Sequence, residues 1–122
     1  MVEVICDTSF LIHLATRRIK NIDNIDVEIG QVTFVVPQVV QNELSELIKN
    51  PLKNQTALAT RDFIKNFKII SISGNFADKE LIDYVKKNRA IIGTMDKELK
   101  KQIKEYGGSI MSFSNDKIVL ES

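Results

Sequence analysis

The predicted fold follows from one short stretch near the start of the chain, Val2-Glu3-Val4-Ile5-Cys6-Asp7-Thr8-Ser9. Its β-branched residues, bounded by polar ones, are typical of a short buried strand. The apolar run over residues 10–15 then fits a first helix. Ligands of open α/β sheets bind in the crevice outside the carboxyl ends of the strands, so Asp7 lies where chemistry is expected. The sequence leaves open the alternative that Asp7 or Thr8 only caps the helix.

The composition is that of an ordinary globular domain. The 122 residues are 43% hydrophobic and 27% charged, which suits a single domain over residues 1–122 with one core. The net charge of +1 is too small to indicate a nucleic-acid binder, so clustered charge must carry that argument. The single cysteine, Cys6, excludes an intrachain disulfide and fits a reduced, cytoplasmic compartment. We expect no signal peptide and no membrane span, because acids interrupt the first apolar stretch and no apolar run is long enough.

Strand-like and helix-like patterns alternate along the rest of the chain. Strands are predicted over residues 32–36, 68–72, 90–94 and 109–113, and residues 118–120 form a short final strand or tail. Apolar residues at helical spacing predict helices over residues 21–29, 38–49, 55–67, 76–87 and 97–106. In the third of these helices the expected core residues are Leu58, Phe63, Ile64 and Phe67. This alternation predicts an α/β fold, a three-layer αβα sandwich with a central parallel sheet of about five strands.

A second acid occupies a place like that of Asp7. Asp96 follows the fourth predicted strand almost directly, and Thr94 and Met95 separate it from the strand's apolar residues. In a parallel sheet of this kind the ends of the first and fourth strands can be neighbours, which would bring the two carboxylates together. The alternative for Asp96 is an N-cap of the helix that follows.

Two further acids stand on helices that begin just beyond strand ends. Glu43 lies four residues from both Val39 and Leu47, on or beside the inward stripe of its helix, where an unpaired carboxylate is costly. Asp78 precedes Leu81 by three residues, so we expect it to project from the centre of the apolar stripe. The alternatives are a Glu43 whose stem packs while its charge reaches water, and an Asp78 that complements the helix dipole.

Four carboxylates that meet in one crevice would repel one another, and this repulsion must be offset by positive charge. Packed carboxylates raise one another's pKa values, and a hard divalent cation relieves that repulsion. Mg²⁺ typically takes one or two carboxylates and keeps several waters. Such an ion can generate hydroxide and clamp the oxygens of an in-line phosphoryl displacement.

With these motifs in this order, the sequence resembles a PIN domain over essentially its whole length. The matching pieces are Asp7-Thr8-Ser9, Pro37-x-x-Val40-x-x-Glu43, Ala77-Asp78 and Thr94-Met95-Asp96-Lys97-Glu98-Leu99. The resemblance implies a PIN-like, Rossmann-like fold and Mg²⁺- or Mn²⁺-dependent cleavage of RNA. The implied catalytic residues and metal ligands are Asp7, Glu43, Asp78 and Asp96, supported by Thr8, Ser9 and Thr94. The chain departs from the family pattern at Met95, where many members have asparagine, and at Lys79, where many have a second aspartate.

The implied function is an endoribonuclease of ribosomal-RNA processing or the toxin of a toxin–antitoxin pair, similar to archaeal PIN proteins. The alternative is a PIN-like scaffold that binds RNA or protein without cutting. The implied partner is RNA, and a second copy in a homodimer, an antitoxin and a ribosome-assembly factor are left open. The cations expected to contact RNA are Arg17, Arg18, Lys20, Lys97, Lys100 and Lys101, although surface cations often only solvate helices.

Other readings of the chain fit less well. A response-regulator receiver needs an aspartate after the third strand, where this chain has Ser73-Gly74, and a lysine after the fifth, where it has Ser114-Asn115. His13 lies inside the first apolar helix, which favours a core or helix-edge position over catalysis. The two tyrosines are too sparse to indicate a base-stacking platform.

Overall fold

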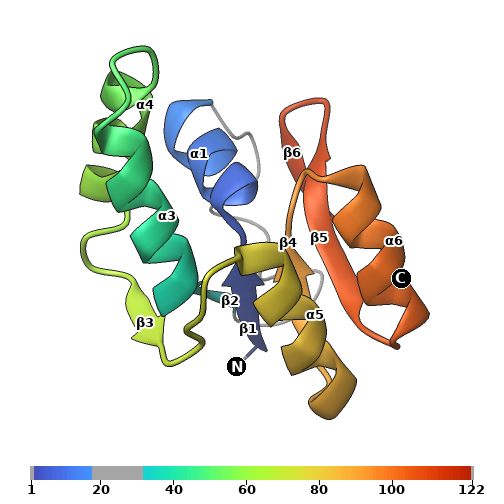
Figure 1. Cartoon of the computed structure of the whole chain (residues 1–122). Coiled ribbons are helices and arrows are strands. Elements are labelled where there is room, and N and C mark those ends of the chain that lie inside the picture. Colours follow the sequence, from blue (N-terminus) through green and yellow to red (C-terminus); the bar gives the residue numbers. More distant parts are fainter. Residues whose placement is uncertain (1, 18–31, 122) are drawn as a thin grey trace.

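A mostly parallel sheet forms the centre of the computed structural model, which describes residues 2–17 and 32–121. Its strand order is β3-β2-β1-β4-β5-β6 (Figure 1). The strands are β1 Val2–Cys6, β2 Val32–Pro37, β3 Lys68–Ile70, β4 Ile91–Gly93, β5 Ser109–Ser114 and β6 Lys117–Glu121. The first five are parallel and β6 is antiparallel to β5. The predicted α/β fold with a central parallel sheet is therefore confirmed, and the uncertain tail is an antiparallel edge strand.

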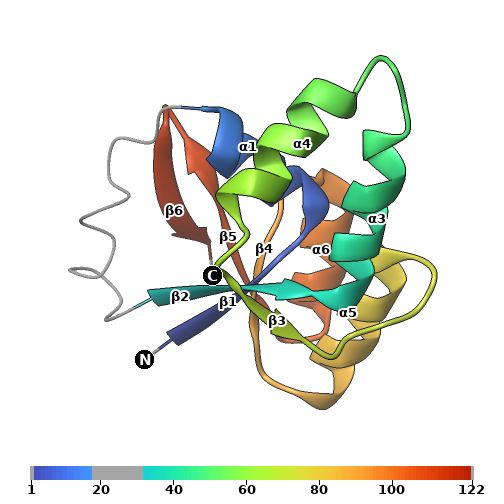
Figure 2. The same cartoon turned by 90° about the vertical axis from the view of Figure 1, so that its left-hand side faces the viewer.

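Helices cover both faces of this sheet (Figure 1 and Figure 2). One face carries α1 Thr8–Thr16, α3 Gln38–Ile48 and α4 Asn54–Phe63, and the other carries α5 Ala77–Lys87 and α6 Lys97–Glu105. Successive residues of a strand point to opposite faces, so Val4 and Val36 join the first layer while Ile5 and Val35 join the second. The helix predicted over residues 21–29 lies outside the described residues. No helix of the described part is long and apolar enough to cross a membrane.

Aromatic side chains fill the layer beneath α1. Phe10 is fully buried, with its ring centroid 4.8 Å from that of Phe113 and 5.9 Å from that of Phe34. His13 stacks on Phe113 with centroids 4.2 Å apart. His13 is partly buried, so its predicted core or helix-edge position is confirmed.

The core face of α4 differs from the sequence prediction. Its buried residues are Ala57 and Thr60, whereas Leu58 and Phe63 are each 40% exposed, so their assignment to the core was wrong. Ile64, directly after the helix, is buried as predicted. The helix presents small residues to its neighbours, which lets it approach closely, and apolar periodicity does not reveal such a face.

We expect Gly93→Ala to lower the free energy of unfolding by about 1–3 kcal/mol, the usual cost of overpacking a core. A Cβ at Gly93 would lie 3.0–3.1 Å from three carbons of the Phe10 ring, which is too buried to move aside. Urea denaturation measures the effect. In the Phe10→Leu background the same substitution should cost less, and strictly additive costs would show that the Phe10 ring is not the obstruction.

The last strand is tied to α6 by one carboxylate. Glu121 of β6 accepts a hydrogen bond from the Ser112 hydroxyl of β5. It also accepts from the ammonium groups of Lys100 and Lys104, both at 3.1 Å. The Ser112 hydrogen bond and the two lysines lower the pKa of Glu121 to about 2. The edge strand β6 is therefore held by ion pairs with α6 as well as by its backbone hydrogen bonds to β5.

Glu121→Gln should destabilise the protein by about 1 kcal/mol at pH 7, a value that allows for solvent screening of a partly exposed cluster. Because the folded pKa of Glu121 is depressed, its contribution is full above the ordinary value of 4.5 and disappears as pH falls to about 2. Thermal melting across this range measures it, with Glu105→Gln on the exposed side of α6 as control. A difference that persists unchanged to pH 2 would assign the effect to packing.

Candidate active site

The candidate site lies where two central strands end side by side. Cys6 of β1 pairs with Gly93 of β4, and the amide of Asp7 donates to the Gly93 carbonyl at 2.8 Å. From β1 the chain leads to β2 on one side, whereas β4 leads to β5 on the other. This is a topological switch point, the usual ligand position in open α/β sheets. The expected adjacency of the first and fourth strand ends is confirmed.

Asp7 is the buried acid of this site, with 9% of the residue exposed. Its Oδ2 accepts hydrogen bonds from the hydroxyls of Thr94 at 2.6 Å and Ser9 at 3.0 Å. Burial raises the pKa of Asp7, the two hydroxyls oppose the rise, and the charge of Glu43 adds to it. The ionised carboxylate therefore lies in an environment that a nearby cation would relieve.

The two hydroxyls also fix the segment that leads into α6. The Thr94 oxygen accepts from the amide of Asp96 at 3.1 Å, and the Ser9 oxygen accepts from the amide of Met95 at 3.1 Å. Thr94 is fully buried. Asp7 and the 94–96 segment are thus parts of one hydrogen-bond network.

Asp96 caps α6. Its Oδ1 accepts from the amides of Glu98 at 2.9 Å and Leu99 at 3.1 Å, while the residue as a whole is exposed. The alternative prediction that Asp96 is the N-cap of the helix is therefore confirmed. The two cap hydrogen bonds engage Oδ1 and fix the direction of the carboxylate at the rim of the site.

Glu43 links three helices beside Asp7. Its Oε1 accepts from the Thr8 hydroxyl of α1 at 2.7 Å, and its Oε2 accepts from the Ala77 amide, the first of α5, at 3.1 Å. The residue is half-buried on the inner side of α3, as its spacing predicted. Its carboxylate is close enough to act electrostatically on Asp7.

Asp78 is placed differently from the other acids. The buried stripe of α5 consists of Ala77, Leu81 and Val85, so the expectation that Asp78 projects from the centre of that stripe was wrong. The side chain is exposed and lines a groove with residues of α5 and α6. Its carboxylate accepts a hydrogen bond from the amide of Lys79 at 2.9 Å. Its part in the site stays a prediction.

The oxygen-only donor set fits a small divalent cation in part. Among the described residues no group of three or more histidine, cysteine, aspartate or glutamate side chains lies close enough to hold a metal ion. Mg²⁺ needs only one or two carboxylates beside its waters, and Asp7 with Glu43 provides such a pair. The four-acid metal site itself stays a prediction.

The predicted RNA-contacting cations divide into three groups. Arg17, at the end of α1, and Lys97 and Lys101, on α6, are exposed. The side chain of Lys100 is only 20% exposed and bound to Glu121, which leaves it poorly placed for RNA. Arg18 and Lys20 lie outside the described residues.

Sequence reasoning missed a pocket beside Glu43. It has a volume of about 470 Å³ between α3 and the loop before α5, and its other lining residues are Val39, Asn42, Glu46, Leu47, Gly74 and Asn75. Gly74 and Asn75 indicated only a loop in the sequence. The pocket arises from the folding of that loop against α3, which no local pattern records.

Comparison with known proteins identifies the family of this chain. Residues 4–115 match the family described as PIN like domain, and the chain belongs to this family. It is similar to Ribonuclease VapC4 of Methanocaldococcus jannaschii, 32% identical over 121 residues that cover 91% of this chain and 89% of that protein. The fold is that of the PIN domain endonuclease Utp24, with a TM-score of 0.77, 24% identity, and coverage of 98% of this chain and 90% of that one. The resemblance to PIN domains is thereby confirmed.

We expect Asp7→Asn to raise the stability of the metal-free protein by about 1 kcal/mol, because it removes a buried charge that opposes folding. The pKa of Asp7 is raised in the folded state, so the advantage exists above that raised pKa and disappears as pH falls below the ordinary value of 3.8. Urea denaturation in EDTA at several pH values measures it. A loss of stability at pH 7 would mean that the two hydroxyls outweigh the cost of burial.

Proposed function

We propose that this PIN-like chain is a metal-dependent endoribonuclease that hydrolyses RNA phosphodiester bonds at the carboxyl ends of β1 and β4. The observation that carries the proposal is the buried Asp7 beside Glu43 at the switch point of the sheet. RNA as the substrate is supported by a relative of 32% identity that is named a ribonuclease. The proposed ligands for Mg²⁺ or Mn²⁺ are Asp7, Glu43 and Asp96, and the experiments below test Asp78 separately.

Each proposed ligand is held in position by its neighbours. Thr94 and Ser9 orient Asp7, while the Thr8 hydroxyl and the Ala77 amide orient the two oxygens of Glu43. A bound divalent ion would lower the pKa of a water molecule that it binds, and its positive charge would stabilise the oxygens of the phosphate. The protein contributes carboxylates that hydrogen bonds already hold in position, so little reorganisation is needed when substrate arrives.

The phosphate backbone of RNA needs positive charge around this acidic centre. Exposed Arg17 directly follows the helix that begins after Asp7, and exposed Lys97 and Lys101 lie on the helix that begins after Asp96. We assign all three to contacts with the RNA backbone. Binding of this kind is sequence-tolerant and weakens with salt through counterion release. The accompanying proposals are a single cytoplasmic domain, a homodimer, and a role in ribosomal-RNA processing or as a toxin with a cognate antitoxin.

A second candidate function is an RNA- or protein-binding scaffold without catalysis. It is favoured by the finding that the described residues contain no cluster of three metal-ligating side chains. Metal binding and cleavage separate the two candidates, since a scaffold requires neither.

Mn²⁺ should raise the melting temperature of the wild-type protein by about 4 °C when its concentration is tenfold above the dissociation constant, by mass action. Asp7→Asn should abolish this shift. Asp83→Asn, whose native carboxylate pairs with Lys79 at 3.1 Å, is the control that should keep it. Asp78→Asn tests the fourth acid, because a normal shift in that variant would exclude it from the ligands. An equal shift in wild type and Asp7→Asn would refute the proposed metal site.

In Mn²⁺ the wild-type protein should cut single-stranded RNA, and Asp96→Asn should bind RNA normally but cut about 100-fold more slowly, because it loses one of the proposed metal ligands. Gel assays of cleavage and fluorescence anisotropy of binding measure the two steps. Lys101→Ala should instead weaken binding and flatten its salt dependence. Binding without cutting in wild type, across several RNAs and both metals, would favour the scaffold.

A further inference from the structure

The pocket beside Glu43 adjoins the candidate active site. Glu43 lines it and, through the hydroxyl of Thr8 and the amide of Ala77, also faces the strand ends. A nucleotide whose phosphate lies at the carboxylates would therefore have the pocket next to it. Its volume of about 470 Å³ is large enough for a small ligand group.

The walls of the pocket combine an apolar floor with polar groups. Val39 is buried and Leu47 is partly buried, which gives the floor. Asn42 and Asn75 add amides to the lining, and the Asn42 oxygen already accepts from Gln38 Nε2 at 3.1 Å. The Asn42 NH₂ group is the part of that amide able to donate to a ligand. A flat heteroaromatic group with polar edges suits this combination.

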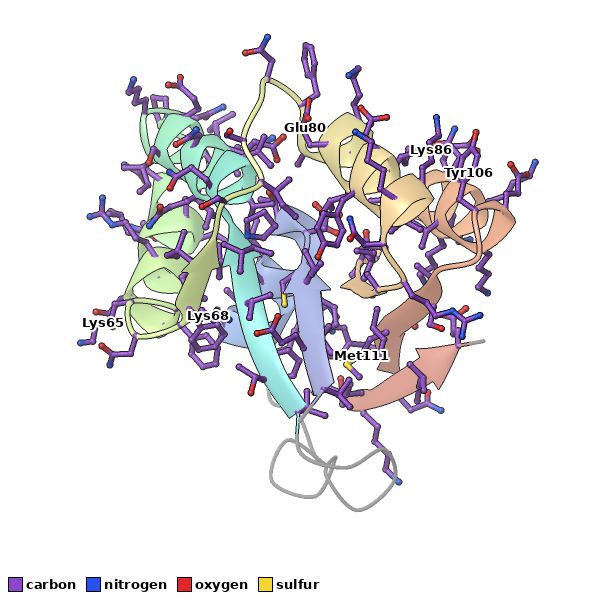
Figure 3. The ribbon with its side chains drawn as sticks, turned by 90° about the horizontal axis from the view of Figure 1, so that it is seen from below. Lys65, Lys68, Glu80, Lys86, Tyr106 and Met111 are labelled. Atoms are coloured by element: carbon purple, nitrogen blue, oxygen red, sulfur yellow. The ribbon has the colours of Figure 1, made fainter. Side chains whose placement is uncertain are left out.

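The loop wall is held against α5. Gly74 has a φ of +143°, and a Cβ at this position would overlap the carboxylate of Glu80. Figure 3 shows Glu80 near the start of α5, beside the loop that leads into this helix. Only glycine adopts this backbone conformation without strain, so Gly74 permits the path that the loop takes over the pocket.

An exposed aromatic ring stands next to the pocket in the chain. Phe76 is 65% exposed, and it lies between Asn75, which lines the pocket, and Ala77, whose amide binds Glu43. Aromatic side chains on which bases stack are the common feature of single-strand RNA recognition.

The charges of the lining indicate which base fits. Glu43 and Glu46 contribute carboxylates, and none of the described lining residues is a cation. Glu46 pairs with Lys49 at 3.1 Å through Oε1, and because both side chains are more than 70% exposed the pair is weak and leaves Oε2 able to accept. A carboxylate favours a base edge with two adjacent N–H donors. Guanine offers such an edge, whereas uracil offers two carbonyls beside one N–H.

We propose that this pocket is a nucleobase subsite that accommodates a guanine of single-stranded RNA, with Phe76 stacking at its edge. The inference rests on the proposed ribonuclease function and adds a base preference to it. We propose RNA as the occupant of the pocket, because the pocket shares Glu43 with the candidate active site. An apolar side chain of a protein partner is the competing occupant that the experiment must eliminate.

The first test uses nucleosides, which carry no phosphate and need no metal. Guanosine should shift the side-chain amide signals of Asn42 and Asn75 in ¹⁵N NMR spectra, and uridine should shift them less at the same concentration. Asn75→Ala should weaken the response of the Asn42 signal to guanosine. Equal responses to both nucleosides, or none, would overturn the proposal. A response to N-acetyl-leucinamide but not to guanosine would also overturn it in favour of a protein partner.

The second test compares two exposed aromatic residues. Phe76→Ala should weaken binding of a guanine-containing single-stranded oligoribonucleotide about tenfold in EDTA, which prevents cleavage. Tyr106→Ala is the matched control, since Tyr106 is 48% exposed and lies under the ammonium group of Lys86, 4.7 Å from the ring centroid (Figure 3). Circular dichroism verifies that both variants fold. Equal losses in the two variants would refute a subsite at Phe76.

The outcomes separate the subsite from the enzyme activity. If guanosine binds in the pocket but wild type never cuts RNA in Mn²⁺, the ribonuclease proposal fails while the subsite stands. If wild type cuts RNA but guanosine leaves Asn42 and Asn75 unperturbed, the subsite fails alone.

Discussion

Burial of the Asp7 carboxylate at the end of the central strand is the constraint on which the site depends. A charged oxygen in this position needs donors, and Thr94 and Ser9 supply them at 2.6 and 3.0 Å. The same two hydroxyl oxygens accept from the backbone of the segment that enters α6. The electrostatic requirement of one acid thus aligns the start of α1 with the start of α6, and with it the carboxylate of Asp96.

Glu43 of α3 connects this network to the start of α5. Because its two oxygens bind Thr8 and the Ala77 amide, α3 is connected to the first residue of α1 and the first residue of α5. Negative charge near a helix N-terminus is favourable, which helps to hold a carboxylate close to Asp7. The same residue forms part of the adjoining pocket, so catalysis and base recognition would share one positioned side chain.

The structure explains why methionine is tolerated at position 95, where many PIN domains have asparagine. The contact that this position makes with Ser9 is through its backbone amide, so the network around Asp7 does not need a particular side chain there. Lys79 instead pairs with Asp83 one turn along α5, 3.1 Å away, and so stabilises the helix. Position 79 therefore takes part in an ion pair on the surface of α5 and contributes no carboxylate to the predicted site.

The sequence by itself determined the alternation of strands and helices, the parallel sheet, and the position of Asp7, because β-branched runs, apolar periodicity and strand-end acids are local patterns. It also placed Glu43 inward through its spacing from Val39 and Leu47. Only the tertiary structure decided that α4 packs through Ala57 and Thr60, because burial depends on how closely a neighbouring helix approaches. The exposure of Asp78 and the pocket beside Glu43 follow from the same cause: they depend on the rotation of α5 and the path of its preceding loop, which packing sets and local periodicity does not encode.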